Sequence, residues 1–299
     1  MLVQKMIRRV LDPDDINPKT AGLRENLTEV ANLIERAVPK MPSVQDDYSF
    51  RCASQVHGAV RNTLAHVIEI LSIEANSSTD NPLIFPPEGP EEIDAYIESL
   101  TIEKCRAAVM SGGNFHGEPI ALANDYLTMA IAELGSISER RVAKVVDGKH
   151  NNGLPSLLVD KSGLNSGFMI PQYTAAALVS ENKSLCFPAS VDSIPTCENT
   201  EDHVSMGLIA ALKTRVVLEN VEKIIAIELL NAFQAVHFRA PFHKEMGQGT
   251  QAVFDFMSET DGIQFVSEDR ILAPLISKTL ELVTRGTIAE LLTDKPGLV

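Results

Sequence analysis

Residues 201–239 read EDHVSMGLIAALKTRVVLENVEKIIAIELLNAFQAVHFR, with one glycine (Gly207) and no proline. Apolar side chains recur along the whole stretch, which predicts a single helix of roughly 50 Å or more at about 1.5 Å per residue. Glu201 and Asp202 stand where carboxylates favour the helix dipole, so we expect the helix to begin with them. A helix this long must pack side by side with others, within the chain or across subunits.

The rest of the chain repeats this pattern. From residue 48 to residue 75, Val56, Val60 and Leu64 begin an apolar stripe of helical spacing. Further helices are expected at 24–38, 91–110, 119–146 and 166–185, and two short ones near the end, the last beginning at Ser267. No useful alternating pattern predicts strands. The expected fold is all-α, a bundle of long helices, with a turn-rich segment at 1–44, the bundle at 45–240 and short helices at 241–299.

Composition narrows the function classes. The chain has 44% hydrophobic residues, no tryptophan and a net charge of −14, without a strongly basic stretch, so nucleic acid is not expected as a partner. No apolar run reaches about 18 residues and residues 1–10 hold no leader-like core, so we expect a cytoplasmic protein without membrane spans. The four cysteines have no metal-ligand spacing and are expected to be free thiols.

Three polar clusters could carry chemistry, but each has a structural alternative. Tyr48 and Arg51 share a helix face, and the planar guanidinium suits a carboxylate, although a salt bridge to Asp46 or Asp47 would explain Arg51 equally well. Residues 111–119 form a glycine-bearing loop that enters a helix and could approach a ligand, or could be a plain turn; no Gly-Lys-Ser/Thr follows to make it a P-loop. Glu201 could act in a site or only cap its helix.

Taken together, short strings in these regions resemble the aromatic amino acid ammonia-lyases, above all histidine ammonia-lyase. Nine matching strings occur in the family's order, which makes the resemblance specific from about Gln45 to Arg239. They are Gln45–Cys52 (QDDYSFRC), Ile73–Asn76 (IEAN), Asp80–Leu83 (DNPL), Ser111–His116 (SGGNFH), Ser138–Arg141 (SERR), Asn165–Met169 (NSGFM), Ser180–Lys183 (SENK), Ser190–Thr196 (SVDSIPT) and Glu201–Met206 (EDHVSM).

The resemblance implies a homotetramer of long helices that removes ammonia from an α-amino acid and leaves a trans double bond. It also implies an electrophilic methylidene-imidazolone, made from an Ala-Ser-Gly tripeptide, with no metal or diffusible cofactor. By resemblance, Gln45, Tyr48 and Phe115 surround the electrophile. Arg51 binds the substrate carboxylate, and Met169 and Glu201 line the side-chain pocket. Relatives specific for phenylalanine or tyrosine tend to have glutamine in place of Glu201, and a carboxylate suits an imidazole N–H, so L-histidine is the expected substrate and urocanate the product.

The chain departs from the family in two respects. Residues 86–110 form a longer connection than is usual before the Ser-Gly-Gly-Asn string. The chain also contains no Ala-Ser-Gly, and the nearest string is Ala53–Ser54–Gln55. We therefore expect a C-terminal half that is inactive alone and pairs, in a homo- or hetero-oligomer, with an N-terminal half that carries the electrophile. One alternative is a non-catalytic remnant or structural subunit of the same fold. A second is a phenylalanine or tyrosine ammonia-lyase or aminomutase. A fumarase-type lyase is disfavoured because its signature loop is missing.

Overall fold

The computed structural model describes residues 45–85, 98–99, 101–103, 109–239 and 246–293. The helix expected at 24–38 lies outside the described residues, as does most of the one expected at 91–110. None of the helices in the described part is both long and apolar enough to cross a membrane. The elements are α3 (Tyr48–Arg51), α4 (Ala53–Ala75), β1 (Leu83–Ile84), β2 (Val109–Met110), α7 (Glu118–Val146), α8 (Met169–Leu185), α9 (Gly207–Phe238), α10 (Gln248–Glu259), α11 (Ala273–Thr284) and α12 (Thr287–Thr293), with short 3-10 turns at Ser156–Leu158 and Cys197–Asn199.

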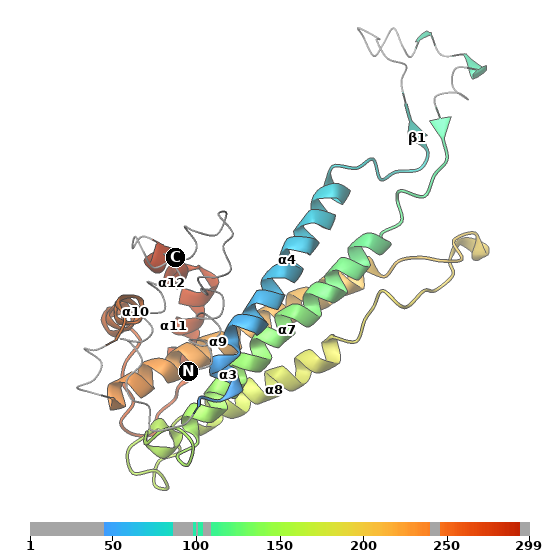
Figure 1. The fold of residues 1–299 in the computed structure, drawn as a ribbon. Helices are drawn as coiled ribbons and strands as arrows, with labels where there is room; N and C mark the ends of the chain where they lie inside the picture. Colours follow the sequence, from blue (N-terminus) through green and yellow to red (C-terminus); the bar gives the residue numbers. More distant parts are fainter. Residues whose placement is uncertain (1–44, 86–97, 100, 104–108, 240–245, 294–299) are drawn as a thin grey trace, which may run out of the picture.

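Four long helices, α4, α7, α8 and α9, lie side by side and form an elongated bundle (Figure 1). α7 and α9 run in the same direction, since the Thr128 and Thr214 hydroxyls meet at 2.7 Å and Ser138 donates to Glu228 at 2.6 Å further along. α8 runs the opposite way, because Gln172 near its start reaches Glu139 on α7. The all-α bundle is therefore confirmed, and α9 is unbroken over 32 residues.

The core begins between α7, α8 and α9 and continues into the short C-terminal helices. Ile224 and Ile227 of α9 are almost fully buried against Val142 and Ala175. Towards the end of α9, α10 and α11 pack against it through a second cluster of buried side chains, which includes Leu230. The buried amide of Gln234 donates to the carbonyls of residues 158 and 266 and accepts from the amide of residue 266, so its polar atoms are satisfied inside the core.

Two expectations about helix ends were wrong. α9 begins at Gly207 rather than at Glu201, because residues 197–199 adopt left-handed backbone angles and fold 196–201 into a tight turn. Three helices rather than two follow α9 among the described residues, and α11 begins at Ala273 rather than Ser267. The Asp269 carboxylate accepts the backbone N–H groups of Ser166 and Gly167, which ties this stretch to the start of α8 instead of opening a helix.

Candidate active site

Tyr48 and Arg51 lie on α3, at the end of the bundle where α7 finishes. The Arg51 guanidinium carbon lies 4.5 Å from the centroid of the Tyr48 ring, a cation–π contact that confirms their shared face. Tyr48 is 70% exposed and Arg51 is exposed. Asp47 instead pairs with Lys144 at 2.7 Å, and no carboxylate pairs with Arg51 within the described ranges. Its two-pronged donor face therefore remains available to a carboxylate ligand.

Gln45 and Met169 lie at the same end of the bundle. Gln45 is exposed three residues before Tyr48. Met169 is half-buried as the first residue of α8, and Gln172, one turn later, donates to Glu139 on α7 at 3.1 Å. The loop before Met169 is held by Asp269, which accepts from the Gly167 amide at 2.8 Å. These backbone hydrogen bonds, first from Ser166 and then from Gly167, lower the pKa of the Asp269 carboxyl.

Phe115 lies at the opposite end, in the loop that leads into α7. The β1–β2 pair comes just before this loop, at the far end of α4 (Figure 1). The Asn81 side-chain oxygen accepts from the Ser111 hydroxyl at 3.2 Å and the Gly112 amide at 3.1 Å, which fixes the glycine-bearing loop. Phe115 remains 55% exposed, so its ring is free to pack on another molecule or subunit.

Glu201 lies at this second end, in the turn before α9. Its backbone pairs with Thr196 in both directions, and the Thr196 hydroxyl donates to its carboxylate. Nearby, the His116 and His203 rings stack with centroids 5.5 Å apart, and His116 Nε2 lies 3.1 Å from the His203 carbonyl oxygen. Phe115 and Glu201, each next to or near one of these histidines in the chain, therefore belong to one region.

The six candidate residues thus form two groups rather than one pocket. Arg141, in the last turns of α7, bonds α3 near Tyr48 and Arg51, whereas Phe115 precedes the first turn of the same helix. Arg141 lies 23 residues beyond Glu118, the first residue of α7, so the groups stand about 35 Å apart at about 1.5 Å per residue. Tyr48 and Arg51 therefore do not meet Phe115 and Glu201 within one chain. A site that uses both groups requires more than one copy of this chain.

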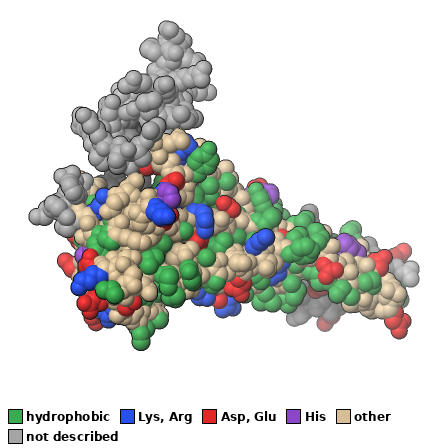
Figure 2. All heavy atoms as spheres, turned by 90° about the horizontal axis from the view of Figure 1, so that it is seen from below, with side chains coloured by type: hydrophobic (Ala, Val, Ile, Leu, Met, Phe, Trp, Pro, Cys, Tyr) green, Lys and Arg blue, Asp and Glu red, His purple; other side chains and the backbone are tan. Residues whose placement is uncertain are grey.

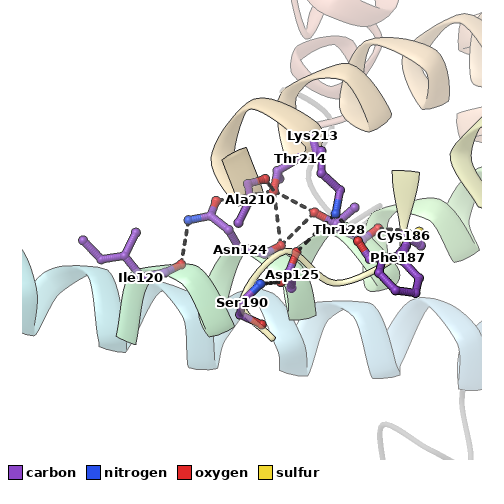
Figure 3. A network of polar contacts seen from close by, with 10 residues as sticks. All are labelled: Ile120, Asn124, Asp125, Thr128, Cys186, Phe187, Ser190, Ala210, Lys213 and Thr214. Atoms are coloured by element: carbon purple, nitrogen blue, oxygen red, sulfur yellow. Dashed lines mark hydrogen bonds and ion pairs between the residues drawn. The ribbon is translucent and has the colours of Figure 1, made fainter. Parts of the chain in front are cut away.

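A buried polar network near the starts of α7 and α9 was not predicted from the sequence (Figure 3). Asp125 of α7 accepts from the Ser190 amide at 2.7 Å and lies 3.7 Å from the Lys213 amine of α9. Lys213 also donates to the carbonyl of Phe187, and burial raises the pKa of the neighbouring Cys186 thiol. The network fixes the segment after α8 that leads to Glu201. Its partners are 26 to 88 positions apart in sequence, so no local sequence pattern predicts it.

The long-helix bundle and the placement of these strings define the class of protein. The family model described as aromatic amino acid lyase matches residues 7–259, and the chain belongs to this family.

Individual proteins similar to this chain show which members of the family it resembles. The chain is 45% identical over 287 residues to a histidine ammonia-lyase of Natranaerobius thermophilus. This match covers 96% of this chain and 52% of that protein. Among solved structures, histidine ammonia-lyase from Trypanosoma cruzi matches with a TM-score of 0.73 and 38% identity, covering 98% of this chain and 52% of that one. Tyrosine aminomutase from Streptomyces globisporus matches with a TM-score of 0.74 and 36% identity, covering 90% and 48%. The chain spans about half the length of the curated relatives it matches.

Proposed function

We propose that this chain supplies the C-terminal part of the active site of a histidine ammonia-lyase, which eliminates ammonia from L-histidine to give urocanate. The observation that carries the proposal is the exposed Arg51, stacked on Tyr48 and without a carboxylate partner in the described part of the chain. The identity to histidine ammonia-lyases supports the substrate. We place the enzyme in the cytoplasm, in histidine catabolism.

In this proposal each residue has a physical task. Arg51 holds the substrate carboxylate through two parallel N–H donors, while Tyr48 and Gln45 donate hydrogen bonds near the electrophile and the substrate amine. Phe115 packs beside the electrophile. Glu201, oriented by the Thr196 hydroxyl, uses its remaining lone pairs to accept from the substrate imidazole. Met169 lines the same side-chain pocket.

The electrophile itself must come from other residues. The methylidene-imidazolone of this family, when present, activates the substrate for loss of ammonia, but the tripeptide that forms it is not among these 299 residues. We therefore propose that a polypeptide segment with Ala-Ser-Gly completes the site.

The assembly we propose is a tetramer. Exposed hydrophobic side chains along the long helices support a partner surface of this kind. They occur on α4, as at Ile68 and Ile73, and on α9, as at Leu208 and Leu212, and Figure 2 shows hydrophobic side chains distributed along the elongated body. Apolar exposure of this extent is typical of surfaces that pack on other subunits.

The test is urocanate formation, followed by its ultraviolet absorbance, with this chain alone and with a matured N-terminal half that carries Ala-Ser-Gly. We expect activity only from the mixture. In that mixture Arg51→Ala should lower kcat/KM by more than about 100-fold, since it leaves the substrate carboxylate unpaired. Arg61→Ala, which removes an exposed arginine of α4, is the matched control. Activity from the chain alone would refute the missing electrophile, and an inactive mixture would favour a non-catalytic subunit.

A second candidate, an aminomutase or a lyase for phenylalanine or tyrosine, is favoured by the similarity to tyrosine aminomutase. Glu201→Gln separates the two. If Glu201 accepts from imidazole, the variant loses more activity with histidine than with phenylalanine, because a phenyl ring never used the carboxylate. Equal losses with both substrates would remove Glu201 as the selecting residue.

A further inference from the structure

α3 carries Tyr48 and Arg51 but has little packing of its own. It is four residues long and none of its residues is buried. A helix this short gains almost nothing from its own hydrogen bonds, because nucleation is costly. Only Cys52 separates α3 from α4, so α3 must be held from α4 on one side and from α7 on the other.

One arginine of α7 makes that connection. Arg141 Nη1 donates to the Ser49 carbonyl, in the middle of α3, at 3.2 Å. One turn further along α7, Lys144 pairs with Asp47 at 2.7 Å. The residues on either side of Tyr48, Asp47 through its carboxylate and Ser49 through its carbonyl, are thus tied to the last turns of α7.

Arg141 is itself fixed from α9. Its Nε and Nη2 donate to the two carboxylate oxygens of Glu228, the second at 2.8 Å, and the Ser138 hydroxyl donates to the same carboxylate at 2.6 Å. The two side chains are only 15% and 24% exposed, so solvent screens the pair weakly. Because Nε and Nη2 of the guanidinium are both bonded to Glu228, the remaining nitrogen, Nη1, is held in a fixed direction, towards the Ser49 carbonyl.

We propose that Arg141, oriented by Glu228, is a positioning residue that holds α3 so that Tyr48 and Arg51 face the site. It touches neither substrate nor electrophile; it transmits the rigidity of the α7–α9 contact to a short exposed segment. The inference that α3 is tethered stands on the contacts alone, and its meaning for catalysis rests on the proposed function.

A lysine at position 141 separates the tether from the ion pair. Its ammonium can still pair with Glu228 but cannot at the same time reproduce the third donor of the planar fork. Arg141→Lys should therefore loosen α3, which the Lys144–Asp47 pair still holds, while leaving the bundle folded. Glu228→Gln removes the charge that orients the guanidinium and should act in the same direction. Arg215→Lys is the control, since Arg215 is exposed on α9 and pairs only with Glu219 among the described residues.

The primary measurement is hydrogen–deuterium exchange on the full chain. The amides of Phe50, Arg51 and Cys52, which donate to the Asp47 and Tyr48 carbonyls, report on α3. We expect about tenfold faster exchange there in Arg141→Lys, the equivalent of one hydrogen bond from a charged donor, with α7 and α9 unchanged. A purely structural arginine would instead speed exchange along α7 and α9. Unchanged α3 amides in both variants would overturn the proposal.

The second measurement uses the enzyme assembled with the Ala-Ser-Gly half. There Arg141→Lys should raise KM for histidine about tenfold with a smaller fall in kcat, because a displaced Arg51 weakens carboxylate binding. Faster α3 exchange with an unchanged KM would overturn the positioning role. If the parent assembly is inactive, the proposed function fails, while faster exchange in the lysine variant still supports the tether.

Discussion

Gly167 lies two residues before Met169, and its replacement by alanine tests how the start of α8 is built. Gly167 has φ +47°, and a Cβ there would lie 2.5 Å from the Leu157 carbonyl oxygen and 2.6 Å from Val159 Cβ. Both neighbours are backbone or next to it, so neither can rotate away. Left-handed backbone costs an alanine roughly 1–2 kcal/mol, and overpacking adds roughly 1–3 kcal/mol.

Gly167→Ala should therefore lower the free energy of unfolding by about 2–5 kcal/mol in urea titration. Gly153→Ala is the control that isolates the backbone cost, because Gly153 has φ +85° and nothing within 4 Å of an added Cβ. That variant should lose only about 1–2 kcal/mol. Equal losses at the two positions would show that the close approach to residues 157 and 159 is absent.

Three further changes test other parts of the bundle. Ile224→Ala opens space in the fully buried contact of α9 with α7 and α8 and should cost about 3 kcal/mol in urea titration; a loss below about 0.5 kcal/mol, as on a surface, would contradict that burial. Thr214→Val removes one hydroxyl of the buried Thr128–Thr214 pair and should cost about 1 kcal/mol; a stabilised variant would show that the pair is not formed. Asp269 has a pKa below its ordinary value, so it stabilises the fold above about pH 4 and loses this effect as pH falls further. Asp269→Asn should be less stable than the parent at neutral pH, and the difference in thermal midpoint should shrink in acid; a constant difference would exclude the linkage.

Local sequence patterns predicted the long helices well. α7 has Pro119 in its first turn and ends at Val146 as expected, and α9 spans its proline-free apolar run. Such patterns work because one helical stripe must be buried along the whole length, so the signal is repeated many times.

Two predicted helix starts were wrong, one because of an unexpected local turn and one because of distant hydrogen-bond partners. No sequence pattern near Glu198 predicts left-handed backbone, yet residues 197–199 all adopt positive φ. The resulting turn prevents the helix from beginning at Glu201, where we expected it to begin. Asp269 looked like a first-turn carboxylate, but its partners are amides 102 and 103 positions away. The spacing of Tyr48 and Arg51 correctly predicted their shared face, whereas the tether from Arg141 to Glu228, 87 positions apart, had no local signal.

The length of α7 has a consequence for how activity would depend on protein concentration. In the proposed enzyme, the site residues are divided between the two end regions of a helix about 43 Å long, so a complete site would form only where these regions of different chains meet. Mass action then governs the number of sites, as it governs the population of any assembly. On dilution, the specific activity of such an enzyme would fall as assemblies dissociate, even while every individual chain stayed folded.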